Sequence, residues 1–167
     1  MARTYLKKAE RTSQTDASQP HATVVEILQA IEAGGDAKAI GYAKKFDKYD
    51  GNILLSADEI EAASAQVSQK LKDDIHFAHD NVRRFAEMQK STVQDVEMEI
   101  VPGVIAGQKA IPVDAAGCYV PGGRYSHIAS AVMTVTTAKV AGCGHITACS
   151  PPRPGVGSAP AIVYAAH

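Results

Sequence analysis

Several features that would place this chain in a specialised class are missing from its sequence. Its 17 Lys and Arg against 18 Asp and Glu leave a formal net charge of −1, which provides no basic surface for nucleic acid or anionic lipid. No apolar run approaches the roughly 20 residues that span a membrane. The polar N-terminus also lacks the apolar segment of a secretory signal. We therefore expect a cytoplasmic protein with no nucleic-acid or membrane partner.

Cysteine is scarce, since the chain has only three, at unrelated spacings. An odd number of this kind fits a reducing compartment better than a disulfide framework. Cys118 and Cys149 fall on strands predicted to be buried, where a thiol behaves as a small apolar group. No neighbouring base or positive charge is available to activate Cys118, Cys143 or Cys149 as a nucleophile. We interpret the three as packing residues.

Carboxylates are absent from residues 115–167. Residues 1–90 carry 13 Lys and Arg with 14 Asp and Glu, whereas residues 91–167 carry 4 of each. A stretch so poor in charge favours a sheet covered by helices on both faces. It also excludes acid–base chemistry by a pair of carboxylates within residues 115–167.

The first half of the chain has the pattern of amphipathic helices. Residues 1–20 are polar and are expected to form an irregular arm. Apolar residues at helical spacing predict a helix over residues 22–33, with Gly34-Gly35 as its stop. A second short helix follows from Asp36 and ends in the turn-like residues 47–52.

A capping box then predicts the start of another helix. Ser56 stands at the N-cap and Glu59 three residues later. The helix runs on, or restarts, as far as Lys90. It carries one apolar stripe at a spacing of three or four residues, formed by Val67, Leu71, Ile75, Ala78, Val82 and Phe85.

The period of the pattern changes near residue 95. Val96, Met98 and Ile100 alternate with acidic residues, which predicts a half-buried strand. Pro102-Gly103 then turns the chain, and residues 108–113 are expected to return as the second strand of a hairpin.

A strand, a glycine turn and a helix follow the hairpin. The strand ends at residues 118–120, residues 121–123 form the Pro-Gly-Gly turn, and the helix stops near Gly142. Adjacent glycines permit positive φ and leave no Cβ in the way of a ligand. Ser126 is the expected N-cap of a helix whose free N–H groups can receive an anion. The spacing matches no nucleotide-binding fingerprint, so a purely structural turn explains it equally well.

A second strand over residues 145–149, a Pro-rich loop and a last helix from about residue 158 complete the chain. Strand, helix, strand and helix at this spacing predict a parallel βαβ unit. We expect an α/β chain divided into a helical region, residues 1–92, and a second region, residues 93–167. The second region holds the hairpin and the start of an incomplete Rossmann-like domain.

The stretch GCYVPGGRYSHIASAVMTVTTAKVAG, followed by CSPP, resembles the histidinol dehydrogenase family. A looser resemblance extends back through PGVIAGQKAIPVDAAG. Arg-Tyr-Ser-His after the glycines is more similar to the sulfopropanediol dehydrogenase branch than to histidinol dehydrogenase itself. Family members are much longer, so we expect the N-terminal portion of a longer enzyme or a truncated gene product.

The resemblance implies oxidation of an alcohol to a carboxylate by two hydride transfers to NAD, with zinc orienting the substrate, in a homodimer. The implied substrate is 2,3-dihydroxypropane-1-sulfonate, which gives sulfolactate. The family's zinc ligands and Glu-His pair belong after His167, so no catalytic residue or metal ligand is assigned here, and this chain alone is expected to be inactive. One alternative is histidinol dehydrogenase, and another is a non-catalytic remnant that acts as a binding or oligomerisation module.

The resemblance also implies a cofactor contact. Tyr119 matches the family tyrosine that contacts NAD, and Pro121, Gly122 and Gly123 complete the matching turn. The alternative for Tyr119 is an aromatic ring that packs on the following helix.

Two residues after the turn are candidates for binding an anionic substrate. Arg124 and His127 lie beside the expected helix start, and both donate charge-assisted hydrogen bonds. A sulfonate gains from such donors, whereas histidinol gains little from an arginine. A surface arginine and a histidine that caps its own helix explain the pair equally well.

His76 and His79 stand at helical spacing beside acidic residues, a pattern also found in metal sites. We favour a solvated or interface-facing flank of the helix for these two histidines. The family resemblance offers a metal site at this position no support.

Overall fold

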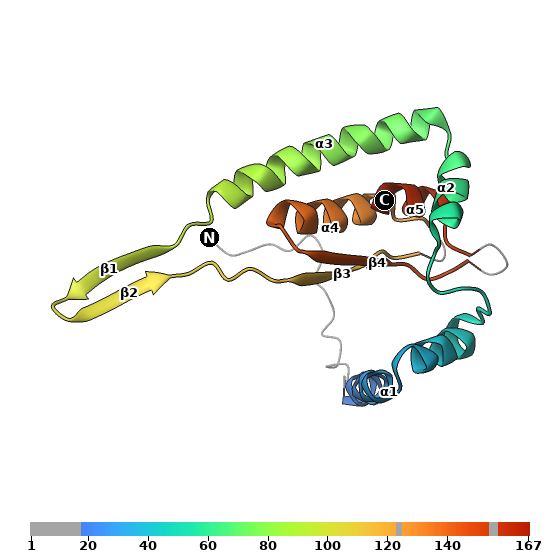
Figure 1. Cartoon of the computed structure of the whole chain (residues 1–167), viewed down its shortest axis with the longest axis horizontal. Helices are drawn as coiled ribbons and strands as arrows, with labels where there is room; N and C mark the ends of the chain where they lie inside the picture. The colour runs from blue at the N-terminus through green and yellow to red at the C-terminus, as the bar shows by residue number, and fades with distance from the viewer. Residues whose placement is uncertain (1–17, 123–124, 154–156) are drawn as a thin grey trace, which may run out of the picture.

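The computed structural model describes residues 18–122, 125–153 and 157–167 as helices and two small sheets (Figure 1). The expected α/β chain, with N-terminal helices, a hairpin and a parallel βαβ unit, is confirmed. Most of the expected irregular arm lies outside the described residues. Within the described ranges, no helix combines the length and apolar composition of a membrane span.

The first helix bends at a glycine. Helix α1 (Ser18–Tyr42) is interrupted at Gly35, where φ is 57° and ψ is −149°. It continues into one π-helical turn, η1 (Ala43–Asp47), and Lys48 ends that turn in the left-handed region with φ of 52°. The predicted break between two helical segments is therefore confirmed, because glycine adopts a positive φ without a steric penalty.

The predicted capping box begins α2 (Ala57–Ala65). The Ser56 hydroxyl accepts a hydrogen bond from the Glu59 N–H at 3.2 Å, and the Glu59 carboxylate accepts one from the Ser56 N–H at 2.7 Å. The hydrogen bond from the Ser56 backbone is the main cause of a lowered pKa for Glu59. The ionised Glu59 carboxylate therefore stabilises the folded state at pH values above the ordinary pKa of a glutamate. This stabilisation is lost as the pH falls through the lowered pKa of Glu59. The helix then restarts at the N-cap Ser68 as α3 (Gln69–Ser91).

The apolar stripe of α3 is confirmed in its first half and shifts in its second. Val67 and Ile75 are buried, as predicted. Phe85, which was also assigned to the stripe, is 58% exposed, and its neighbour Ala86 is buried instead. Helix α3 packs against the helix of the βαβ unit.

The hairpin differs from its prediction in two ways. Strand β1 (Val96–Val101) pairs antiparallel with β2 (Val104–Gln108), and the chain reverses at Pro102-Gly103. The predicted return strand at residues 108–113 is wrong, because the tight turn, with φ of 83° at Gly103, starts the pairing at once. The prediction of a half-buried strand is also wrong, since every residue of both strands is exposed. The hairpin projects from the rest of the chain (Figure 1).

The βαβ unit matches its predicted boundaries closely. Strands β3 (Ala115–Tyr119) and β4 (His145–Cys149) are parallel and pair residue for residue over their whole length. Helix α4 (Ile128–Ala141) connects them and ends at Gly142, whose φ of 95° gives the expected left-handed cap. Helix α5 (Pro160–Ala166) follows β4.

The core lies on one side of this two-stranded sheet. Its centre is formed by Val120, Ala131, Ala159 and Ile162, which are at most 5% exposed. Helices α3, α4 and α5 lie on the same side (Figure 1). The prediction of a sheet covered on both faces is therefore wrong for the described residues, and four of the five residues of β4 are exposed.

Candidate functional site

The candidate site lies where β3 and β4 end. Tyr119 pairs with Cys149 in the last register position, so both strands end at the same edge of the sheet. The Val120 N–H donates to the Cys149 carbonyl at 2.8 Å and extends the pairing by one residue. Ligands of open α/β sheets bind outside the carboxyl ends of parallel strands, and this edge is the corresponding place here.

Tyr119 presents an accessible ring at this edge. It is 62% exposed, whereas Cys118 and Val120 on either side are 4% and 0% exposed. The strand alternation therefore turns Tyr119 away from the core. The tyrosine is not packed under α4, and its ring is available for stacking against a ligand.

The turn after β3 packs closely on the segment after β4. A Cβ placed on Gly122 would lie 3.0 Å from both the Ser150 Oγ and the Pro151 carbonyl oxygen. The absence of a Cβ at Gly122 thus eases the close approach of two protein loops, in addition to any contact with a ligand. Gly123 and Arg124, which the sequence assigned to cofactor and substrate binding, lie outside the described residues.

The start of α4 differs from its prediction. His127 occupies the N-cap, is exposed, and makes no capping hydrogen bond with its side chain. Ser126, the predicted N-cap, instead accepts a hydrogen bond from the Arg153 Nη2. The prediction for Ser126 is wrong because a charged donor from the loop after β4 takes the hydroxyl, and the helix begins one residue later.

Arg153 is the residue of this site that the sequence reasoning missed. It is half-buried in the loop after β4 and reaches 27 residues back along the chain to Ser126. The sequence offered one signal for Arg153, which is the composition of the segment around it. An arginine in a segment without carboxylates has no local ion-pair partner.

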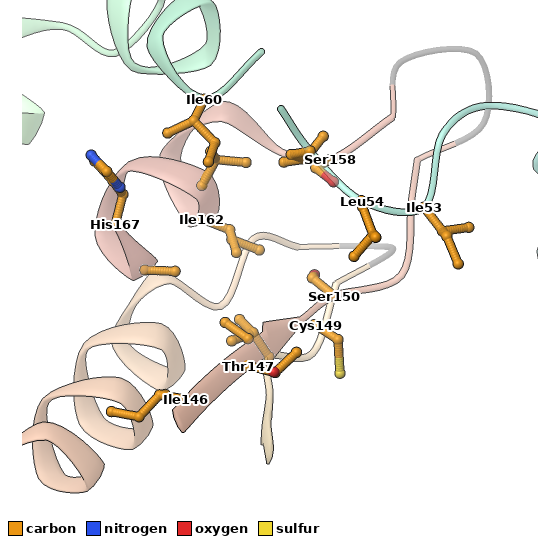
Figure 2. A pocket seen from close by; sticks show the side chains of 15 residues that line it. Ile53, Leu54, Ile60, Ile146, Thr147, Cys149, Ser150, Ser158, Ile162 and His167 are labelled. Atoms are coloured by element: carbon orange, nitrogen blue, oxygen red, sulfur yellow. The ribbon is translucent and has the colours of Figure 1, made fainter. Parts of the chain in front are cut away.

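A pocket of about 390 Å³ runs beside β4 (Figure 2). Five consecutive residues, 146–150, line it, so the pocket follows the strand. Leu54 and Ile162 add apolar side chains to the lining of the pocket. Ser150 Oγ is the one buried side-chain polar atom without a hydrogen-bond partner among the described residues. Because Tyr119 and Pro121 do not line this pocket, we do not assign it to the cofactor.

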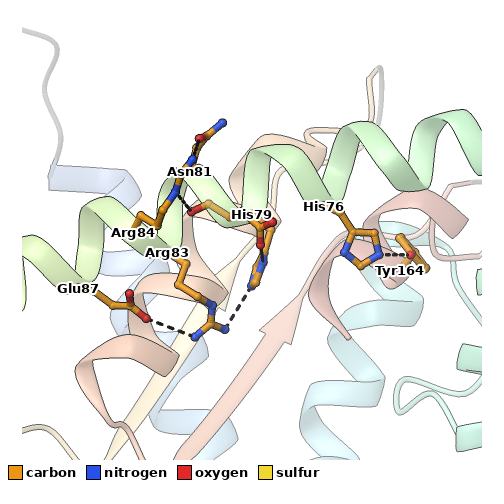
Figure 3. A network of polar contacts seen from close by, with 8 residues as sticks. His76, His79, Asn81, Arg83, Arg84, Glu87 and Tyr164 are labelled. Atoms are coloured by element: carbon orange, nitrogen blue, oxygen red, sulfur yellow. Dashed lines mark hydrogen bonds and ion pairs between the residues drawn. The ribbon is translucent and has the colours of Figure 1, made fainter.

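The two histidines of α3 take part in separate polar contacts (Figure 3). The Nε2 of His76 lies 2.8 Å from the Tyr164 hydroxyl of α5, which joins two helices. His79 Nε2 lies 3.3 Å from the Arg83 Nη2, and its Nδ1 lies 3.2 Å from Asp80. Since Arg83 is always a donor, Nε2 is the acceptor and Nδ1 carries the proton toward Asp80. The His76 contact links α3 to α5, and the His79 contacts stay within α3. The two histidines therefore do not converge on a common point.

The three cysteines differ in their exposure. Cys118 is buried, as predicted, Cys143 is half-buried, and Cys149 is exposed. The prediction that Cys149 is buried is wrong, because no described helix covers that face of β4.

The residues of the strand edge fit a dinucleotide better than a metal ion. Tyr119 offers an open aromatic surface, and Arg153 brings a guanidinium to the same edge through Ser126. Within the described ranges, no three His, Cys, Asp or Glu side chains are grouped so that they could hold a metal ion. These residues therefore do not fit zinc, and no step through a metal is derived from them.

Comparisons with known proteins relate the chain to one family. The family model described as histidinol dehydrogenase matches residues 10–167. A sulfopropanediol 3-dehydrogenase of Ruegeria pomeroyi is 76% identical over 163 residues, which are 98% of this chain and 38% of that protein. A histidinol dehydrogenase homolog of Pelagibacter ubique is 54% identical over 99% of this chain and 39% of its own length. The chain thus spans about two fifths of these relatives.

A solved structure resembles the described fold. The crystal structure of histidinol dehydrogenase from Elizabethkingia anophelis superimposes with a TM-score of 0.75 at 34% identity. The match covers 97% of this chain and 35% of that one.

Proposed function

Because the chain belongs to the histidinol dehydrogenase family, we propose that it forms the N-terminal part of an NAD- and zinc-dependent alcohol dehydrogenase. The proposed reaction oxidises 2,3-dihydroxypropane-1-sulfonate to sulfolactate. One water is consumed and two hydrides are transferred as the terminal alcohol becomes a carboxylate. The similarity to the Ruegeria pomeroyi sulfopropanediol 3-dehydrogenase is the observation that carries this proposal.

Within this chain, the proposed task is to hold the cofactor and part of the substrate. NAD, when bound, accepts the hydrides. Tyr119 stacks against it at the end of β3, an assignment supported by the exposed ring. Pro121 and Gly122 are proposed to contact it from the end of β3, and the part of Gly123 in the proposal rests on its place in the sequence alone. Gly122 keeps the turn after β3 close to the neighbouring loop.

Arg124 and His127 are proposed to bind the sulfonate. His127 is exposed at the first turn of α4 and has no capping bond of its own, so its ring is free to donate to a ligand. Arg124 adjoins it in sequence, and its part in the proposal rests on that position alone. No residue of this chain is proposed to transfer a proton in the reaction or to bind zinc. Those groups are proposed to lie in the remainder of the enzyme.

The test is NAD reduction at 340 nm by the full-length enzyme with added zinc. Histidinol and 2,3-dihydroxypropane-1-sulfonate are offered side by side at matched concentrations. We expect turnover of the sulfonate and little of histidinol, because the proposed hydrogen-bond donors Arg124 and His127 favour an anionic substrate. Turnover of histidinol alone would keep the family and discard the sulfonate assignment. A folded protein that turns over neither compound would discard the proposed reaction.

We also propose a homodimer, and the β1–β2 hairpin supports it. An isolated two-stranded hairpin is marginally stable in water, and this one exposes large apolar side chains along both strands. They are Val96, Met98, Ile100, Val101, Val104 and Ile105. We propose that a second copy of the enzyme packs against these apolar side chains.

Replacing Ile105 by lysine tests that surface. Ile105 is 71% exposed, so the change leaves the fold of one copy intact but places a charge in the proposed interface. We expect light scattering to give a dimer for the full-length wild type and a shift toward monomer for the variant. The control is Phe77→Lys, which changes an exposed apolar residue outside the hairpin, on α3. A monomeric wild type, or a variant that remains fully dimeric, would contradict the proposal.

A further inference from the structure

Arg153 connects the two loops that follow β3 and β4. Its backbone forms a bridge with Gly157, in which the Arg153 N–H donates at 2.8 Å and the Gly157 N–H returns a bond at 3.1 Å. Its guanidinium donates to Ser126, two residues before α4 begins. The loop after β4 therefore places a guanidinium against the loop after β3.

Within the part of the chain that the structure describes, the Arg153 cation has no acidic partner. The sequence also contains no Asp or Glu after Asp114. A guanidinium carries five N–H donors, and the bond to Ser126 uses one of them. A half-buried arginine in this state has charge and donors available for an anion, and partial burial strengthens that attraction relative to bulk water.

Ser126 adds a second donor at the same point. Its oxygen accepts from Arg153, and its own hydroxyl hydrogen remains free to donate. Guanidinium and hydroxyl together match the oxygens of a tetrahedral anion. They lie at the carboxyl edge of the parallel strands, where α/β folds bind ligands.

We propose that Arg153, together with Ser126, binds a tetrahedral oxyanion at the edge of β3 and β4. The anion is either the sulfonate of the substrate or the pyrophosphate of the dinucleotide, which share the same oxygen geometry. This inference rests on the proposed function. It adds to that function a binding residue outside the turn of residues 121–127.

The test compares wild type, Arg153→Ala and Arg153→Lys in the full-length enzyme. We expect Arg153→Ala to raise one KM by about 10- to 100-fold, because a charge-assisted hydrogen bond is lost. A rise for the sulfonate alone identifies the substrate as the source of the anion, and a rise for NAD identifies the pyrophosphate. Arg153→Lys keeps the charge and should recover part of the loss. Arg84→Ala, which removes an exposed α3 arginine bonded to Asn81, is the matched control.

A purely structural role gives a different result. The proposal fails if Arg153→Ala lowers the melting temperature or kcat while both KM values stay within about twofold of wild type. Should wild type oxidise no sulfonate, the proposed substrate is wrong. Titration of NADH by fluorescence and of the sulfonate by calorimetry then decides the role of Arg153. Equal dissociation constants for wild type and Arg153→Ala, or no binding of either compound, would overturn the proposal.

Discussion

Replacing Tyr119 by alanine in the full-length enzyme is expected to raise the KM for NAD by about 5- to 150-fold, the range expected when one aromatic stacking contact of about 1–3 kcal/mol is lost. The ring is 62% exposed at the end of β3, while its neighbours Cys118 and Val120 anchor the strand in the core. The substitution therefore removes a surface ring without opening a cavity. The melting temperature should remain close to that of wild type.

Two further variants sharpen the Tyr119 experiment. Tyr119→Phe keeps the ring, so a KM near that of wild type would assign the effect to stacking, and a large rise would assign it to the hydroxyl. Phe77→Ala removes a 72% exposed ring from α3 and serves as the control. An unchanged KM for NAD in Tyr119→Ala would remove Tyr119 from the cofactor site.

Replacing Ile162 by alanine is expected to lower the free energy of unfolding of this chain by about 2–4 kcal/mol, the usual cost of truncating a buried isoleucine. Ile162 is 4% exposed and packs with Val120 and Ala131 in the core. Since whole domains are stable by only about 5–15 kcal/mol, this is a large fraction of the total. Urea unfolding followed by circular dichroism measures it.

The matched control is Ile111→Ala, at an isoleucine that is 82% exposed. We expect a change within about 0.5 kcal/mol there. The loss of unfolding free energy for Ile162→Val should lie between the losses for Ile111→Ala and Ile162→Ala, because this change removes one methylene. A loss below about 1 kcal/mol for Ile162→Ala would mean that α5 does not share the cooperative core with the β3–α4 turn. In that case Tyr119 would not be positioned through that core.

The parts of the fold that were predicted correctly depend on neighbours close in sequence. The break at Gly35 and the end of α4 at Gly142 follow from glycine at positive φ. The capping box joins Ser56 to Glu59, only three residues apart. The boundaries of β4 follow from a five-residue segment, residues 145–149, between Gly144 and the Pro-rich loop. In each case the chemistry of a few adjacent residues is sufficient.

The candidate site was predictable only in part. The position of Tyr119 at a strand end follows from its place in the β3 pattern, and its exposure follows from strand alternation. Ser126 carried an N-cap signal, but a donor distant in sequence competes for its hydroxyl. The exposure of Cys149 likewise depends on which elements cover β4, and a strand pattern does not contain that information.

The order of helices and strands, the capping box at Ser56, the end of α4 at Gly142 and the family of the chain follow from the sequence alone, because they depend on local pattern and on runs of similar residues. The contacts between residues distant in sequence, including the one that replaces the predicted cap at Ser126, depend on the three-dimensional fold. Arg153 reaches Ser126 across 27 residues, and His76 reaches Tyr164 across 88. Such contacts form when parallel strands and packed helices bring separate segments to one edge, and no spacing along the chain encodes their distance in space.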